Sequence, residues 1–210
     1  MAAIITDQIR LLNAGNFVSG VTSTTNAYYS FIGLPNPTDV DSDWNNDPPA
    51  PKDNFSEEND YWDDMVALKK VAASDCRQVV KKRTWSSGTT YDMYRGDYSR
   101  SNTAPVSGAT NLYASTFYVI NSDYRVYICL QNGTNPENTE GRPSLDEPLF
   151  TDLEPRSAGA SGDGYVWKYL FTINPNQLIK FDSTSFIPLP ADWKTSSEVA
   201  AVRNLSLIHI

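Results

Sequence analysis

Cysteine and long apolar runs are both scarce in this sequence. Cys76 and Cys129 are its only cysteines, too few for a disulfide scaffold and without zinc-ligand spacing, so we expect both to be reduced thiols in the core. No apolar run approaches the length of a membrane span, and the N-terminus lacks the basic and apolar regions of a signal peptide. We therefore expect cytosolic synthesis and no membrane partner.

Positive charge is also in short supply. The chain has 17 Lys and Arg against 25 Asp and Glu, a formal net charge of −8 and a pI of about 4.6. Nucleic-acid binding is driven by clustered cations, so this balance argues against DNA or RNA as a partner. The densest cations lie in 77–85, which lacks an aromatic stacking platform. We interpret this segment as a strand with a solvated face, or with one that meets an acidic partner.

Aromatic residues are plentiful instead, with 12 Tyr and 5 Trp in 210 residues. They suit both β-sheet cores and protein interfaces. The clearest strand is 165–173, where Tyr165, Trp167, Tyr169, Phe171 and Ile173 fall on one face of a two-residue period. It follows a Gly-Asp-Gly turn. We predict a central, buried strand.

A β-hairpin is predicted just before it, with strands at 115–120 and 124–130 around a polar turn at 121–123. About thirty residues rich in Asn, Gly, Pro and acidic side chains then precede the aromatic strand. A loop of that length is expected to be functional or to be anchored on a neighbouring molecule. Further along, we expect 186–190 to be an edge strand or a segment that departs from the sheet, and 193–203 to begin a helix.

The N-terminal third is more mixed. We predict a short helix or strand at 4–12, a turn at 13–16 and a strand at 26–33. Proline and acidic residues make 34–54 an extended arm. Its 39–43 stretch imitates a calcium loop, but Trp44 and Ala50 replace the required Gly and Glu, so we predict no metal site. Helical spacing and an acidic first turn predict an amphipathic helix over 57–73, packed on a sheet.

Four blocks of sequence, in this order and spacing, resemble the baseplate wedge subunit family of contractile-tailed, T-even-type bacteriophages. The blocks are YWDDM at 61–65, KRTW at 82–85, YICL at 127–130 and GDGYVWKYLF at 162–171. The likeness covers about 25–193. It implies a mainly β protein of Ig-like or sandwich-like domains, located in the virion tail baseplate. It also implies a homodimer that joins other baseplate wedge proteins.

The resemblance implies a division into three parts. We expect 1–85 to form the N-terminal part of an outer β domain, 86–193 an inserted β domain, and 194–210 the start of a return segment that is truncated relative to the longer family members. Residues 205–210 match the translation of a sequencing-adapter end. We therefore expect them, including the single histidine His209, to be non-native.

Without His209 the sequence offers no Ser-His-Asp or Cys-His arrangement and no histidine-based metal site. No glycine-rich loop opens a helix, as phosphate binding would require. Catalysis would have to rest on carboxylates, of which two clusters stand out: Asp60, Asp63 and Asp64, and Asp146, Glu147, Asp152 and Glu154. Chance clustering among 25 acidic residues explains both more simply. We predict no catalytic, cofactor-binding or metal-binding residues, and no small-molecule substrate.

The leading hypothesis is therefore a non-enzymatic virion protein that works through aromatic-rich interfaces, with the loops 34–54 and 131–160 reaching adjacent subunits. Two alternatives stay open at this point. One is a carbohydrate-binding β-sandwich of a phage tail, whose aromatic stripe would stack on sugar rings. The other is a small glycosidase. An exposed aromatic platform would favour sugar binding, whereas a buried strand would favour assembly.

Overall fold

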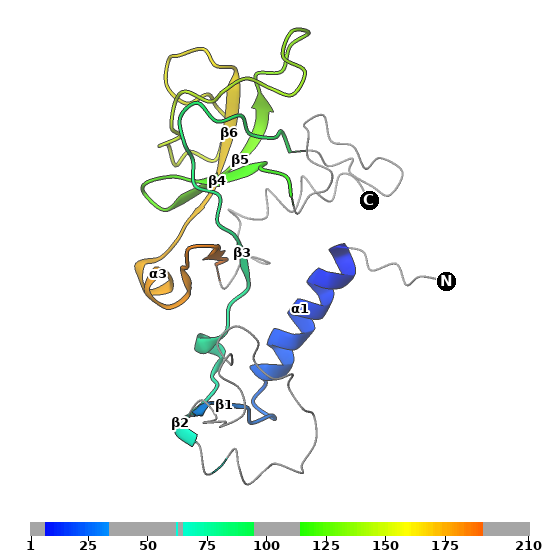
Figure 1. The fold of residues 1–210 in the computed structure, drawn as a ribbon, viewed down its shortest axis with the longest axis vertical. Helices are drawn as coiled ribbons and strands as arrows, with labels where there is room; N and C mark the ends of the chain where they lie inside the picture. The colour runs from blue at the N-terminus through cyan, green and yellow to red at the C-terminus, as the bar shows by residue number, and fades with distance from the viewer. Residues whose placement is uncertain (1–6, 34–61, 63–64, 95–113, 191–210) are drawn as a thin grey trace, which may run out of the picture. The chain divides into compact units, whose positions relative to one another are not determined.

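The computed structural model describes residues 7–33, 62, 65–94 and 114–190. They divide between two compact units, Met1–Gln78 and Val79–Ile210. The strands described form three small antiparallel sheets, ordered β1-β2, β3-β7 and β4-β5-β6, and are accompanied by the helices α1 and α3 (Figure 1). The prediction of a mainly β protein is confirmed. The finer division at residues 85 and 193 stays a prediction.

In the first unit, helix α1 runs over Asp7–Val21. The predicted helix or strand at 4–12 is thus helical where the structure describes it, but the turn predicted at 13–16 is wrong because these residues lie inside α1. Gly15 is the reason for the error. A glycine inside a helix costs only about 1 kcal/mol relative to alanine, so it weakens a helix without ending it.

Strands β1 (Tyr29–Gly33) and β2 (Met65–Lys70) pair antiparallel, with Phe31 opposite Leu68. The strand predicted at 26–33 is confirmed. The helix predicted over 57–73 is wrong across β2, and Ala73–Asp75 form a 3-10 turn instead. Pairing with a strand more than thirty residues away outweighs the local helical spacing here. Of 57–64, only Trp62 is described.

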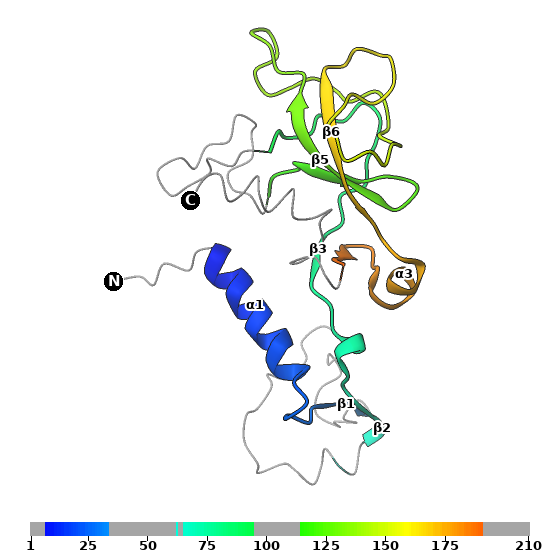
Figure 2. The same cartoon turned by 180° about the vertical axis from the view of Figure 1, so that it is seen from behind.

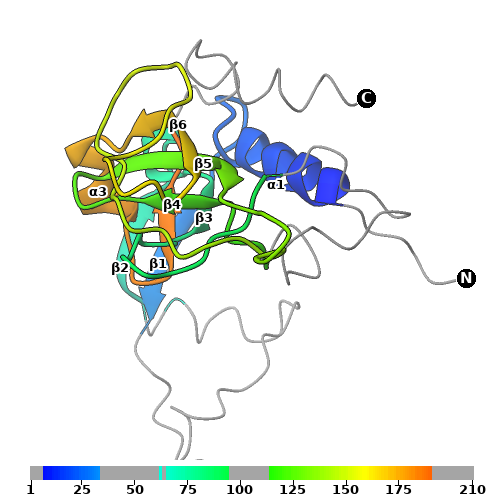
Figure 3. The ribbon, with the colours of Figure 1, turned by 90° about the horizontal axis from the view of Figure 1, so that it is seen from above.

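The second unit is built on the sheet β4 (Tyr118–Ile120), β5 (Arg125–Asn132) and β6 (Tyr165–Thr172). The predicted hairpin is confirmed, since β4 pairs antiparallel with β5. The aromatic strand is also present, but it is not central. Strand β5 is the central strand, with β4 on one side and β6 on the other, as the view from above shows (Figure 3).

Both faces of this sheet are covered by apolar side chains. The first cluster contains Tyr91, Val119, Tyr127, Cys129, Ala158, Tyr165 and Trp167, and the second contains Ile120, Val126, Ile128, Leu170, Phe171, Ile173 and Ile187. Successive residues of β5 alternate between the two, as the pleat requires. In β6 the alternation changes at an irregularity beside Tyr169. The predicted single aromatic face is therefore split: Tyr165 and Trp167 join one cluster, and Phe171 and Ile173 join the other.

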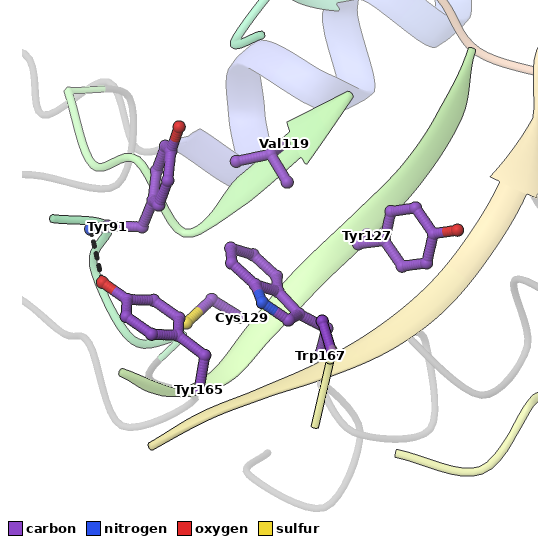
Figure 4. Packing of buried hydrophobic residues seen from close by; sticks show 7 residues of the cluster. Tyr91, Val119, Tyr127, Cys129, Tyr165 and Trp167 are labelled. Carbon is purple, nitrogen blue, oxygen red and sulfur yellow. Dashed lines mark hydrogen bonds between the residues drawn. The ribbon is translucent and has the colours of Figure 1, made fainter. Parts of the chain in front are cut away.

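Trp167 lies at the centre of the first cluster, between Tyr127 on one side and Tyr91 and Tyr165 on the other (Figure 4). Its ring is stacked on Tyr165, with centroids 5.3 Å apart, and meets Tyr91 edge-on at 5.7 Å. Such geometries add about 0.5–1.5 kcal/mol per pair beyond burial. Cys129 is a buried free thiol whose pKa is raised by burial, while Cys76 is free but only half-buried. The predicted core position holds for Cys129 alone. That both thiols are reduced stays a prediction.

The remaining elements of the second unit lie beside β3 (Val79–Lys81), which pairs with β7 (Phe186–Pro188) (Figure 2). Between β6 and β7 runs the short helix α3 (Pro175–Phe181). The cations of 77–85 are less solvated than predicted. Lys82 is half-buried and pairs with Asp182 at 2.8 Å, and the Arg83 guanidinium lies 6.0 Å from the ring centre of Tyr118.

The residues 1–6, 34–61, 63–64, 95–113 and 191–210 are outside the described part of the chain. So the predicted arm at 34–54, the calcium-like stretch at 39–43 and the helix at 193–203 remain predictions. None of the described helices has the length and apolar character that crossing a membrane requires.

Candidate functional site

The long connection between β5 and β6 carries the most distinctive surface of the second unit. Its residues 144–156, called here the leucine loop, expose Leu145, Leu149 and Leu153 at 52%, 52% and 48% of their surface. These leucines recur at every fourth position and are interleaved with Asp146, Glu147, Asp152 and Glu154. A long loop was expected to be functional or anchored, and the contacts below show that this one is held on its own molecule.

The middle of the leucine loop is fastened to the β4–β5 hairpin through its backbone. Three consecutive carbonyl groups accept hydrogen bonds from side chains: Pro148 from Asn121 Nδ2 at 2.8 Å, Leu149 from Arg125 Nη1, and Phe150 from the Tyr127 hydroxyl at 2.6 Å. Pro148 is fully buried, although its neighbours Leu149 and Glu147 are not. Each bond satisfies a carbonyl that the loop has no secondary structure to satisfy. The loop backbone is therefore pre-organised.

Asp163 holds the beginning of the leucine loop. Its carboxylate is buried and accepts the backbone N–H of Leu145 through Oδ2 at 2.9 Å and that of Tyr165 through Oδ1 at 3.0 Å. The turn predicted at Gly-Asp-Gly is confirmed by the positive φ values of Gly162 and Gly164. The role of the aspartate was not predicted. The signal that could have found it is an Asx-turn residue directly before a strand.

The end of the loop is tied to β6. Arg156 exchanges two backbone hydrogen bonds with Trp167, both of 3.0 Å. The Arg156 guanidinium lies 4.5 Å from the ring centre of Phe150 and forms an ion pair with Asp152 at 2.7 Å. An exposed ion pair contributes little to stability, but together with the cation–π contact it fixes where the positive charge sits.

A hollow of about 560 Å³ opens beside the loop. It is lined by Asp146, Glu147, Leu149, Phe150, Arg156, Ser157, Ala158 and Gly159. Both polar and apolar side chains thus face it. The hollow is open to solvent rather than enclosed, which suits a protruding side chain of another protein better than a small molecule that must be surrounded.

Two carboxylates of the predicted loop cluster, Asp146 and Glu147, line this hollow and hold backbone amides. Asp146 Oδ2 accepts the Ser161 N–H at 2.8 Å, and Glu147 Oε1 accepts the Ser122 N–H at 2.8 Å. Hydrogen bonds from Ser161 hold the pKa of Asp146 below its usual value. A glycosidase acid needs a raised pKa, so Asp146 is unsuited to that role. The other predicted cluster, Asp60, Asp63 and Asp64, lies outside the described residues.

Two further observations concern the predicted absence of a metal site and the carbohydrate-binding alternative. Within the ranges described, no group of three His, Cys, Asp or Glu side chains could hold a metal ion. Tyr165 and Trp167 have no exposed surface. These rings therefore offer no stacking platform for a sugar, and the carbohydrate-binding alternative finds no support in β6.

Comparison with known proteins assigns the chain to a family. Residues 3–152 match the family model Phage-Gp8, described as Bacteriophage T4, Gp8. The chain belongs to the Phage-Gp8 family. The match covers more than half of the chain, and the resemblance drawn from the four sequence blocks is confirmed.

The chain is also similar in sequence to the "Baseplate wedge protein gp8" of Enterobacteria phage T4. It is 27% identical to this chain over 202 residues, covering 90% of the chain and 60% of the relative. The chain therefore spans somewhat less than two thirds of the length of that Gp8 protein. The family match ends at residue 152, within the leucine loop.

Proposed function

We propose that this chain is a structural component of a bacteriophage tail baseplate, located in the wedge and acting through protein–protein contacts. The observation that carries the proposal is membership of the Phage-Gp8 family together with the similarity to a T4 baseplate wedge protein. The structure supports it because its candidate surface is a pre-organised loop with exposed leucines, a composition suited to an interface. Its partners are other wedge proteins, encountered after synthesis in the host cytoplasm.

The role we propose is non-enzymatic and needs no metal or cofactor. Asp146 and Glu147 of the leucine loop accept backbone hydrogen bonds, and Asp152 pairs with Arg156. Of the aromatic side chains of β6, Tyr165, Trp167 and Phe171 are buried. An assay of cell-wall glycan hydrolysis checks this part of the proposal. Activity that is lost on Asp146→Asn substitution would contradict it.

The location is tested directly by the protein content of purified baseplates. We expect quantitative mass spectrometry to find this protein in isolated baseplates at a fixed ratio to other wedge components, and to find the same ratio in complete virions. A protein detected only in the infected-cell lysate, and absent from washed baseplates, would contradict the proposal.

We also propose a homodimer, as the resemblance implies. Sedimentation equilibrium of the purified protein measures this independently of the baseplate. Twice the chain mass of 23.4 kDa is expected. A monomer at every concentration up to the solubility limit would reject the dimer and leave the baseplate role standing.

A further inference from the structure

We propose that the leucine loop, residues 144–156, docks a basic amphipathic segment of a neighbouring protein, one that presents Lys or Arg beside apolar side chains. The inference rests on the proposed function, because it assigns one interface of the same assembly. It adds the residues that form this interface and the chemistry of the partner that they recognise.

Within the described part of the second unit, the exposed apolar residues are concentrated in this loop. Leu145, Leu149 and Leu153 are all about half exposed, whereas the other large exposed apolar residues described in the second unit lie singly on other elements: Val79, Tyr124, Ile179 and Phe186. Single exposed apolar residues are ordinary on protein surfaces, but several on one short segment mark an interaction site. The hollow beside Leu149 and Phe150 provides a recess for a partner side chain.

Charge selects the partner. The loop carries four carboxylates against the single guanidinium of Arg156, in a chain of net charge −8. Asp152 already pairs with Arg156, and Glu154 makes no hydrogen bond or ion pair with any described residue. A basic segment meets complementary potential here, and an acidic one is repelled.

The same charge argues against a second copy of this chain as the occupant. Two copies of the loop would bring like charges together. The chain's own cationic stretch is committed elsewhere, since Lys82 pairs with Asp182 at 2.8 Å and the Arg83 guanidinium lies over Tyr118. A separate protein with an unpaired basic segment fits the loop better than this chain does.

The loop is also ready to bind. Hydrogen bonds from Asn121, Arg125 and Tyr127 hold its central backbone, Asp163 holds its beginning, and Trp167 holds its end. Little backbone freedom remains to be lost on association, so the leucine side chains can contribute to affinity with a small ordering cost.

The test uses this protein and the purified wedge proteins of the same phage, mixed one at a time, with affinity measured by isothermal titration calorimetry. Replacing the three leucines together (Leu145→Ser, Leu149→Ser, Leu153→Ser) is expected to weaken binding to one basic neighbour by about 100-fold or more. Leu149→Ser alone is expected to weaken it by about 10-fold. The matched control is Ile179→Ser on α3, where 85% of the side chain is exposed, and it should change the affinity less than about twofold.

The charge requirement is tested separately from the apolar one. The double variant Asp152→Asn, Glu154→Gln is expected to weaken binding to the same neighbour by about 10-fold at 50 mM salt, and the difference from wild type should shrink at 500 mM salt. The control is Glu137→Gln, Glu140→Gln, which removes two exposed carboxylates elsewhere in the same β5–β6 connection. It should leave the affinity within about twofold of wild type.

The outcomes separate this inference from the proposed function. If the wild-type protein binds a wedge neighbour and the leucine and charge variants bind it equally well, the loop assignment is overturned and the baseplate role stands. If the leucine and charge variants lose only self-association, the inference is also overturned, because the loop then binds a second copy of this chain. If the wild type binds no wedge protein and is absent from baseplates, the proposed function itself fails. If the triple variant loses its cooperative melting transition, the affinities of Leu149→Ser and of the double variant Asp152→Asn, Glu154→Gln decide whether the loop is the binding site.

Discussion

Tyr127 connects the buried aromatic cluster to the leucine loop, because its ring is buried and its hydroxyl donates to Phe150 O. Burial raises its pKa to about 12. The folded state thus holds the proton more tightly than the unfolded state, whose tyrosine titrates near 10. Stability from this group is complete below pH 10 and is lost as the pH rises from 10 to about 12, by at most about 1.4 kcal/mol per pH unit.

Tyr127→Phe should therefore flatten the alkaline loss of stability. Urea unfolding followed by tryptophan fluorescence, at pH 8 and at steps from pH 10 to 12, measures it. At pH 8 the variant is expected to be less stable by about 1 kcal/mol, through loss of the hydrogen bond to Phe150. The loss of stability with rising pH that remains in the variant is due to Tyr91, Tyr94 and Tyr165, whose pKa values are also raised by burial. An unchanged slope would show that Tyr127 ionises freely in the folded protein.

Gly164 gives a second prediction for a single residue. It has a φ of +85°, and a Cβ placed there would lie 2.7 Å from the Cα of Gly133. Gly164→Ala is expected to destabilise the protein by about 3 kcal/mol or more, through backbone strain combined with a backbone clash. Gly162→Ala is the control, because Gly162 has a φ of +68° but open space around it. It should cost about 1–2 kcal/mol in the same urea titration. Equal losses would contradict the close approach of Gly133 and Gly164.

Among the elements, α3 depends on one side chain for its beginning. Asn174 Oδ1 accepts the N–H of Asn176 at 2.9 Å, and Pro175 occupies the first helical position. Asn174→Ala is expected to reduce the free energy of unfolding by about 1 kcal/mol, measured by thermal melting. The control Asn176→Ala, inside the helix, should change it by less than about 0.5 kcal/mol. If both variants melt alike, the cap contributes nothing.

The same helix shows how far sequence reasoning reaches. Asn174-Pro175 correctly ended the aromatic strand, but an asparagine cap followed by proline is also a helix-start signal, and that second meaning was missed. The hairpin β4–β5 was predictable because its turn and strands are local. Strand β2 was not, because the helical spacing of Met65 and Leu68 is overridden by pairing with β1. Local patterns carry no information about distant partners.

The candidate surface was predictable only in part. Its length and composition marked the β5–β6 connection as functional or anchored. The sequence did not show which residues of the loop are exposed: Pro148 is buried, whereas Leu149 beside it is exposed. It also did not show that Asp146 and Glu147 accept backbone hydrogen bonds, which speaks against a catalytic role for them. Which face of a loop points outward depends on tertiary hydrogen bonds that no sequence period encodes.

For the whole molecule, family membership and surface chemistry both support the proposed role in assembly. A chain of the Phage-Gp8 family presents an apolar and acidic loop beside the β4-β5-β6 sheet, while Tyr165 and Trp167 of β6 are buried in the core. We therefore expect substitutions that reduce the complementarity of a functional surface to impair function, even where the protein still folds.

The most direct test is baseplate assembly in infected cells that cannot make this protein. A phage with a nonsense codon early in the gene, grown on non-suppressing cells with and without a plasmid copy, is analysed by sedimentation and electron microscopy. The account predicts that complete baseplates are absent without the plasmid and restored by it. Complete baseplates and infectious particles formed at the normal yield without this protein would contradict the account.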